Sequence, residues 1–87
     1  PPLMSSYYVY IILSKIGKKS ISYVGYTKNL KNRLKLHNSS KGAKFTKGKK
    51  WKYIYKKKYN TKSEAMINEY KLKKDRKKRN YIKLKFI

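Results

Sequence analysis

The sequence predicts one small domain of the α/β (α+β) class, with a three-stranded antiparallel sheet flanked by helices. Two segments rich in tyrosine and β-branched residues, 7–14 and 20–24, lie on either side of a short polar stretch, which is typical of a β-hairpin. A third candidate strand, 51–59, lies between two segments with helical spacing of apolar residues. A chain of 87 residues has room for one modest core rather than two.

The predicted hairpin and the helix after it have clear boundaries. Residues 15–19, with Gly17 inside, are expected to form a loop of several residues between the first two strands. Gly25 ends the second strand, and Thr27 is expected to cap a helix over about 28–37. Leucines recur in this helix at a spacing of four, so we expect one face of it to pack on the sheet.

The third strand follows a loop. Residues 38–50 are rich in glycine, serine and lysine and are expected to be this loop. Strict alternation in the strand is expected to place Trp51, Tyr53 and Tyr55 together on one face, with Ile54 among lysines on the other. We expect Trp51 to belong to the core rather than to stack on a nucleic-acid base.

The last part of the chain is expected to be mainly helical. Thr61 and Glu64 form a T-x-x-E capping box, which predicts a helix from there to about Lys78. The tail over 80–87 alternates weakly, so a short strand or a docked coil is expected there.

The charge balance is extreme. The chain has 26 Lys and Arg residues against 3 Asp and Glu residues, for a formal net charge of +23. A polyanion is therefore the expected partner, with nucleic acid first and an anionic membrane surface second. Only Arg33, Arg76 and Arg79 are arginine. Lysine contacts phosphate as a point charge, so we expect backbone binding rather than sequence recognition.

Composition excludes several other classes. Cysteine is absent, which excludes disulfides, a thiolate zinc site and a cysteine nucleophile. No apolar stretch approaches the ~20 residues that cross a bilayer, and no signal peptide is recognisable, so an intracellular location in cytoplasm or nucleus is expected. We interpret residues 1–3 as an expression scar, which leaves 4–87 as the single domain.

Three acidic residues make the candidate metal ligands few. Glu64 is explained by the capping box, and Asp75, among basic residues, is expected to be a surface ion-pair partner. Glu69 lies between Ala65 and Leu72 on the helix stripe that should face the sheet. A carboxylate there needs a cation, which is either a nearby lysine or arginine, or a metal ion.

Basic and aromatic residues supply further candidates. Arg33 and His37 are four residues apart and project from the same face of the first helix. His37 is alternatively a helix-terminus residue stabilised by the dipole. The tyrosines of the hairpin, Tyr10 and Tyr23 among them, are either core residues with satisfied hydroxyls or site residues.

Together these residues resemble the GIY-YIG nuclease family over residues 7–78. Tyr8-Val9-Tyr10 stands where the first triplet of the family would be, and Tyr23-Val24-Gly25 matches the second. The helix with Arg33 and, four residues on, His37 is similar to the family's first helix, and the helix with Glu69 is similar to its metal-binding helix. Tyr8 replaces the glycine of the first triplet, and valine replaces isoleucine in both. Asn80 lies roughly where many members carry an asparagine.

The resemblance implies a metal-dependent reaction on DNA. Glu69 would hold one Mg²⁺ or Mn²⁺, Tyr10 with Tyr23 close by would activate water, Arg33 would stabilise charge on the phosphate, and His37 would relay a proton or orient a tyrosine. We expect the basic field to lower the pKa of the tyrosine base. Three further residues, two lysines and a threonine, are expected to contact DNA phosphates: Lys28, Lys44 and Thr46.

The sequence thus predicts a DNA endonuclease that is structure-selective or of low sequence specificity. It would act in DNA repair, recombination or viral or organellar DNA processing. Its partner is duplex or branched DNA rather than a membrane, and a homodimer, an accessory protein and sequential nicking by one copy all stay open. The alternative is a basic nucleic-acid-binding module that keeps the fold without cutting.

Overall fold

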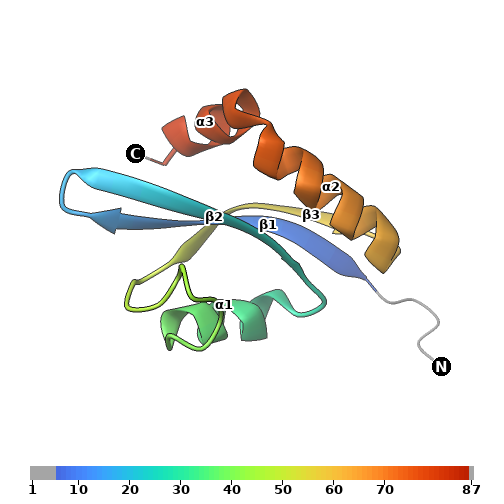
Figure 1. Ribbon diagram of the computed structural model, residues 1–87, viewed down its shortest axis with the longest axis horizontal. Coiled ribbons are helices and arrows are strands. Elements are labelled where there is room, and N and C mark those ends of the chain that lie inside the picture. Colours follow the sequence, from blue (N-terminus) through green and yellow to red (C-terminus); the bar gives the residue numbers. More distant parts are fainter. Residues whose placement is uncertain (1–5, 87) are drawn as a thin grey trace.

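The computed structural model describes residues 6–86 and contains a three-stranded antiparallel sheet between two layers of helix (Figure 1). The predicted fold class is therefore confirmed. The proposed scar at residues 1–3 lies outside the described residues. In chain order the elements are β1 (Tyr7–Ile16), β2 (Lys19–Thr27), α1 (Leu30–Asn38), β3 (Lys52–Tyr59), α2 (Lys62–Lys74) and α3 (Arg76–Leu84).

Strand β1 is the central strand, with β2 and β3 antiparallel on either side of it. The hairpin between β1 and β2 is tighter than expected, because Ile16 pairs with Lys19 and only two residues form the loop. Gly17, the first of them, has φ of +62°, which is the position where a type II′ turn requires glycine. The lysines that suggested a longer loop are instead exposed ends of the two strands.

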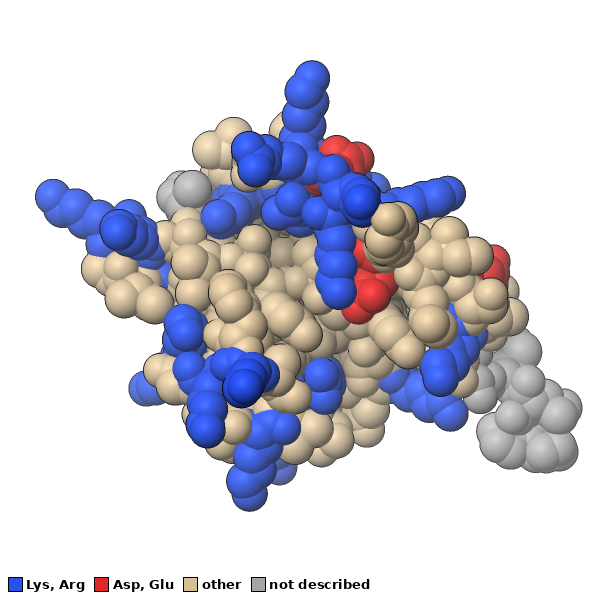
Figure 2. Space-filling model, viewed as in Figure 1, with Lys and Arg blue, Asp and Glu red and all other residues tan. Residues whose placement is uncertain are grey.

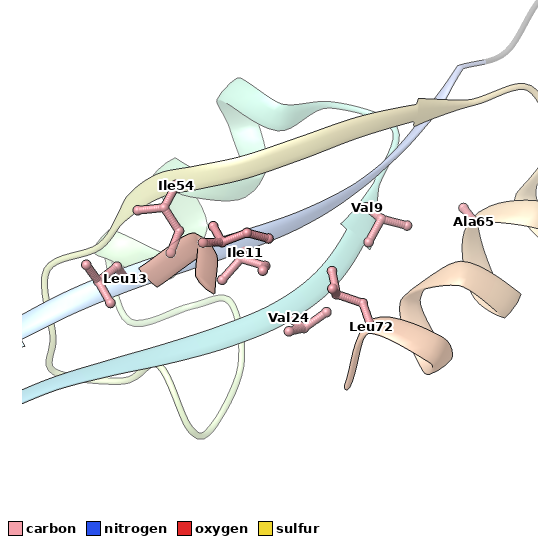
Figure 3. Packing of buried hydrophobic residues seen from close by; sticks show 8 residues of the cluster. Val9, Ile11, Leu13, Val24, Ile54, Ala65 and Leu72 are labelled. Atoms are coloured by element: carbon pink, nitrogen blue, oxygen red, sulfur yellow. The ribbon is translucent and has the colours of Figure 1, made fainter. Parts of the chain in front are cut away.

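The two faces of the sheet carry two separate apolar clusters. On one face, Val9, Ile11 and Leu13 of β1 pack with side chains of α2 and α3. Figure 3 labels Ala65 and Leu72 of α2 beside these strand residues. On the other face, Tyr10 and Ile12 pack with Trp51 beneath α1 and the loop that follows it. The alternation of β1 therefore divides the molecule into a mainly aliphatic side and an aromatic side.

Strand β3 departs from the strict alternation that its sequence suggests. The register against β1 slips between Ile11, which faces Tyr55, and Ile12, which faces Tyr53, so Ile54 is the extra residue of a β-bulge. Tyr53 consequently belongs to the aromatic side, whereas Tyr55 packs with Ile54 against the aliphatic cluster. The prediction that Tyr53 and Tyr55 share a face was wrong because a bulge reverses the alternation.

Helix α1 begins two residues later than expected. Asn29, not Thr27, is the N-cap, and its side chain accepts a hydrogen bond from the N–H of Asn32 at 3.0 Å. Thr27 instead belongs to the end of β2 and accepts a hydrogen bond from the N–H of Asn29. Thr61 is the N-cap of α2 as predicted, because its hydroxyl accepts a bond from the N–H of Glu64.

The expected single C-terminal helix is broken at Asp75. This residue ends α2 and caps α3, where its carboxylate accepts a hydrogen bond from the N–H of Lys78 at 3.0 Å. The predicted surface ion-pair role of Asp75 is thereby replaced by a capping role. The tail is helical rather than a strand or coil, because Ile82 is buried in the aliphatic cluster and holds α3 on the sheet. Within residues 6–86, no helix combines the length and apolar character needed to cross a membrane.

Candidate active site

A chain of hydrogen bonds joins three of the predicted site residues on the aromatic side of the sheet. The Tyr10 hydroxyl lies 2.8 Å from Nε2 of His37 and accepts a hydrogen bond of 3.3 Å from Nε of Arg33. Tyr10 and His37 are both 0% exposed, and Arg33 is half-buried. The face of α1 that Arg33 and His37 share therefore points at Tyr10 of β1. Their i, i+4 spacing predicts that the two side chains share a face, but it does not indicate which residue this face contacts.

Thr46 completes this chain from the loop after α1. Its hydroxyl lies 2.8 Å from Nδ1 of His37, donates to the carbonyl of Ala43 at 3.0 Å and accepts from the N–H of Ala43. Thr46 is 0% exposed, so its expected contact with DNA phosphate was wrong. The residue was assigned to the DNA surface because it lies in a lysine-rich loop, but its side chain turns inward to satisfy the buried imidazole.

These bonds determine the tautomer of His37. A hydroxyl has one proton, and the Ala43 carbonyl accepts that of Thr46, so Nδ1 of His37 must donate to Thr46. Nε2 of the neutral imidazole then has a free lone pair, to which the Tyr10 hydroxyl donates. Tyr10 thus donates its proton to His37 while its oxygen accepts from Arg33.

The ionisation of His37 and Tyr10 reflects their burial. Burial, with a further contribution from the Arg33 charge, lowers the pKa of His37 to about 4, so the imidazole is neutral at pH 7. The interpretation of His37 as a charged residue stabilised by the helix dipole is therefore wrong. Burial also raises the pKa of Tyr10, and Arg33 opposes this rise only in part. Our expectation that the basic surroundings would lower the pKa of the tyrosine was wrong, because loss of solvent outweighs the nearby charge.

Several residues that the sequence did not link to this site hold the hydrogen-bonded chain in place. The side-chain amide of Asn38 donates to the carbonyl of Trp51 and accepts from its N–H, and the Trp51 indole donates to the carbonyl of Thr46. Trp51 is buried, as predicted. Tyr53 packs edge-on against Tyr10 and donates its hydroxyl to the carbonyl of Leu30, and burial raises the pKa of Tyr53 to about 12. No spacing in the sequence links these residues, because tertiary contacts alone bring them together.

Tyr23 is the second hairpin tyrosine and lies beside the buried chain. It is opposite Ile12 in the sheet, and its ring centroid is 5.3 Å from that of His37 in an edge-on arrangement. Tyr23 is half-buried, so part of its side chain reaches solvent, whereas Tyr10 is fully covered. The structure thus places Tyr10, Tyr23, Arg33 and His37 in one group.

Glu69 is the predicted site residue that lies on α2. Its side chain is 19% exposed and its carboxylate lies 3.7 Å from the ammonium of Lys73. Of the two cations expected for Glu69, a nearby basic side chain or a metal ion, the structure contains the first, which is Lys73. The negative charge of Glu69 nevertheless adds to the rise in the pKa of Tyr10, after the larger effects of burial, Arg33 and Tyr23, so the carboxylate acts electrostatically on the tyrosine.

The donor set around Glu69 restricts the kind of metal that fits. Within residues 6–86, no group of three or more His, Cys, Asp and Glu side chains converges on a common point. Tetrahedral zinc, which requires several protein ligands, does not fit. A single carboxylate fits Mg²⁺ or Mn²⁺, since such a cation keeps most of its waters and takes few protein ligands.

The other predicted residues lie on the surface. Lys28 and Lys44 are exposed, and Asn80 is exposed on α3. In the view of Figure 2, Lys and Arg side chains gather over α2 and α3 and again on the α1 side, and an area with few charged atoms lies between them. Acidic atoms lie on the right of this area, next to a basic side chain.

Comparison with known proteins agrees with this geometry. The family model of the GIY-YIG catalytic domain matches residues 6–82. The chain is 46% identical over 68 residues to UPF0213 protein OB0043 of Oceanobacillus iheyensis, and the aligned segment covers 77% of this chain and 76% of that protein. It is 41% identical over 71 residues to UPF0213 protein SH2523 of Staphylococcus haemolyticus, and this segment covers 80% of this chain and 83% of that protein.

No solved structure matches the chain with significance. The family match extends over every element of the fold up to Ile82, and therefore includes Tyr10, Tyr23, Arg33, His37 and Glu69. The chain belongs to the GIY-YIG family, and its relatives are UPF0213 proteins.

Proposed function

We propose that this protein is a divalent-metal-dependent DNA endonuclease that hydrolyses phosphodiester bonds, with structure selectivity or low sequence specificity. The observation that carries the proposal is the hydrogen-bonded chain from Arg33 through Tyr10 to His37. A purely structural tyrosine needs one partner for its hydroxyl, whereas Tyr10 has both a proton acceptor and a cation. That combination suits a group that exchanges a proton next to a developing negative charge.

Because the pKa of Tyr10 is raised, very little of its hydroxyl is ionised to the phenolate at neutral pH. In the proposed relay, no free phenolate forms, because Tyr10 accepts a proton from the attacking water while passing its own proton to Nε2 of His37. The tautomer held by Thr46 leaves Nε2 free for this transfer. Burial disfavours the imidazolium, so His37 would hold this proton only until the leaving oxygen of the phosphodiester takes it up. Because Tyr10 is 0% exposed, the proposal requires a neighbouring side chain to move before water reaches the hydroxyl.

Arg33 has a second role in the proposal. Its guanidinium carries five N–H donors, of which one is engaged with Tyr10, so others can bind a phosphate oxygen as charge builds there. Glu69 would hold one Mg²⁺ or Mn²⁺. When bound, that cation supplies positive charge against the scissile phosphate. Lys73 would exchange its partner Glu69 for phosphate or solvent.

Charge supports DNA as the substrate. A net charge of +23 on 87 residues provides sequence-independent affinity for a phosphate backbone. Lys28 and Lys44 are proposed to contact backbone phosphates, since both are exposed. Thr46 is not proposed to do so.

The test is cleavage of labelled duplex and four-way-junction DNA in Mg²⁺, Mn²⁺ or EDTA by wild type, Glu69→Gln and Glu64→Gln. Both variants remove one carboxylate from α2, but Glu64 is exposed at the helix start, where glutamine also suits a capping box. We expect metal-dependent cutting that Glu69→Gln abolishes and Glu64→Gln retains, with DNA binding intact in both. Equal activity of the two variants would contradict the metal role of Glu69.

Tyr10→Phe and Tyr23→Phe distinguish the two tyrosines. We expect Tyr10→Phe to lower the single-turnover rate by about 100-fold or more, as for loss of a general base. A larger loss in Tyr23→Phe would assign the base to Tyr23 instead. Tight DNA binding without cutting in any metal would make the protein a non-catalytic binding module.

A further inference from the structure

A second feature lies beside the proposed active site and is not used by it. Phe45 is 52% exposed, although its neighbours along the loop and in space, Thr46 and Trp51, are buried. The Thr46 and Trp51 hydrogen bonds anchor this loop, so Phe45 is presented to solvent from a fixed backbone. Exposure alone is ordinary for a surface side chain, and what distinguishes Phe45 is its fixed position beside the proposed active site.

Phe45 is part of an aromatic surface. Its ring stacks on that of Tyr23, with centroids 6.0 Å apart and an interplanar angle of 20°, and Lys49 places its ammonium 5.7 Å from the Phe45 centroid. Tyr23 in turn lies edge-on against the buried His37. The exposed ring is therefore only two aromatic contacts from the proposed catalytic chain.

The two rings border an open hollow of about 390 Å³. Its lining consists of side chains from β2, the loop, α2 and α3: Ser22, Tyr23, Val24, Phe45, Lys73 and Arg79. Lys73 is the ion-pair partner of Glu69, so the hollow adjoins the proposed metal ligand. Aromatic walls with cations beside them match a flat π-system attached to a phosphate, which is the chemistry of a nucleotide.

Base pairing determines which nucleotide can enter. Within an intact duplex both faces of every base are covered by neighbouring bases, so none can stack on Phe45. An unpaired base has free faces and stacks readily on aromatic side chains. The hollow has few groups that could read base edges: Ser22 carries a single hydroxyl, and Nε of Arg79 already donates to the carbonyl of Leu72.

We propose that the hollow bordered by the stacked pair Tyr23 and Phe45 is a stacking site for one unpaired base next to the phosphate that the enzyme cuts. This inference rests on the proposed nuclease function and names its substrate class, which is DNA with a gap, flap, bulge or mismatch at the cleavage position. Selection follows from the free base face and is independent of base identity.

The experiment measures binding without cutting. Wild type, Phe45→Leu, Phe45→Trp and Phe86→Leu are titrated in EDTA at about 150 mM salt, against a duplex with one unpaired 2-aminopurine and the fully paired duplex. Stacking of the unpaired base should quench its fluorescence, and wild type should prefer the unpaired substrate by about 5- to 150-fold. Phe86→Leu is the matched control, because it makes the same change at an exposed phenylalanine of the chain terminus.

We expect Phe45→Leu to abolish the quenching and the preference while duplex affinity stays the same, and Phe45→Trp to retain both. An unchanged preference in Phe45→Leu, or no quenching by wild type, would overturn the stacking site. The proposed function is judged separately, by cleavage in Mg²⁺ or Mn²⁺. Cutting without preference for unpaired DNA would reject the inference alone, whereas stacking without cutting would reject the nuclease.

Discussion

The hydroxyl oxygen of Tyr10 lies so close to the backbone of Gly25 that a β-carbon at position 25 would be 2.5 Å from it. The two residues are partners across the β1–β2 hairpin. The glycine of the second triplet is therefore required for space, because the ring of Tyr10 lies across position 25 on its way to His37. A side chain at position 25 would displace the hydroxyl that links Arg33 to His37.

We expect Gly25→Ala to lower the free energy of unfolding by about 1–3 kcal/mol through overpacking. Displacement of the Tyr10 hydroxyl should lower the cleavage rate by about 100-fold. Urea unfolding and single-turnover cleavage measure the two effects. In a Tyr10→Leu background the alanine should cost less stability, since the ring that it meets is gone. The same cost in both backgrounds would show that Tyr10 is not the obstacle.

Burial of neutral His37 makes stability depend on pH below 6.5. The pKa of His37 is about 4 in the folded protein against about 6.5 in the unfolded chain, so between these values unfolding takes up a proton. The stabilisation is fully present above pH 6.5 and is lost as pH falls toward 4, with a slope approaching about 1.4 kcal/mol per pH unit. Urea unfolding at pH 7, 6 and 5 measures this slope. His37→Gln should remove it, and a slope retained in His37→Gln would assign it to another group.

Thr46 should act as a positioning residue through His37. Thr46→Val keeps the shape but leaves Nδ1 of His37 and the N–H of Ala43 without a partner, so we expect a loss of about 1–3 kcal/mol in stability. Cleavage should fall by about 100-fold, because Nε2 is no longer held as the proton acceptor.

Nitrogen NMR of the imidazole separates this role from a merely structural one. Wild type should show a protonated Nδ1 and a bare Nε2, and Thr46→Ser should preserve both the tautomer and the activity. A loss of stability in Thr46→Val with full activity and an unchanged tautomer would contradict the positioning role.

Asp75 should stabilise α3 as a cap rather than as a charge. Asparagine is as good an N-cap as aspartate, so Asp75→Asn should leave the free energy of unfolding nearly unchanged. Asp75→Ala should lower it by about 1 kcal/mol. Thermal unfolding at low and high salt measures both variants. An equal loss in asparagine and alanine that disappears at high salt would indicate an ion pair instead.

The sequence alone determined the order of the elements as far as α2 and the character of the two faces of β1. Alternation along β1 separates Val9 and Ile11 from Tyr10 and Ile12, because successive side chains of a strand point to opposite faces. The capping box at Thr61 and the spacing of Arg33 and His37 are likewise local. The net charge is a sum over residues that folding does not change.

Only the tertiary structure decided the connections between distant segments. The bulge at Ile54, the break at Asp75 and the inward turn of Thr46 each depend on what lies opposite in space. The pKa of Tyr10 rises because several elements together exclude water, and this effect outweighs a basic field that the composition made obvious. Phe45 is left exposed for the same kind of reason, since neighbours from other segments anchor its loop and leave its ring outside the core.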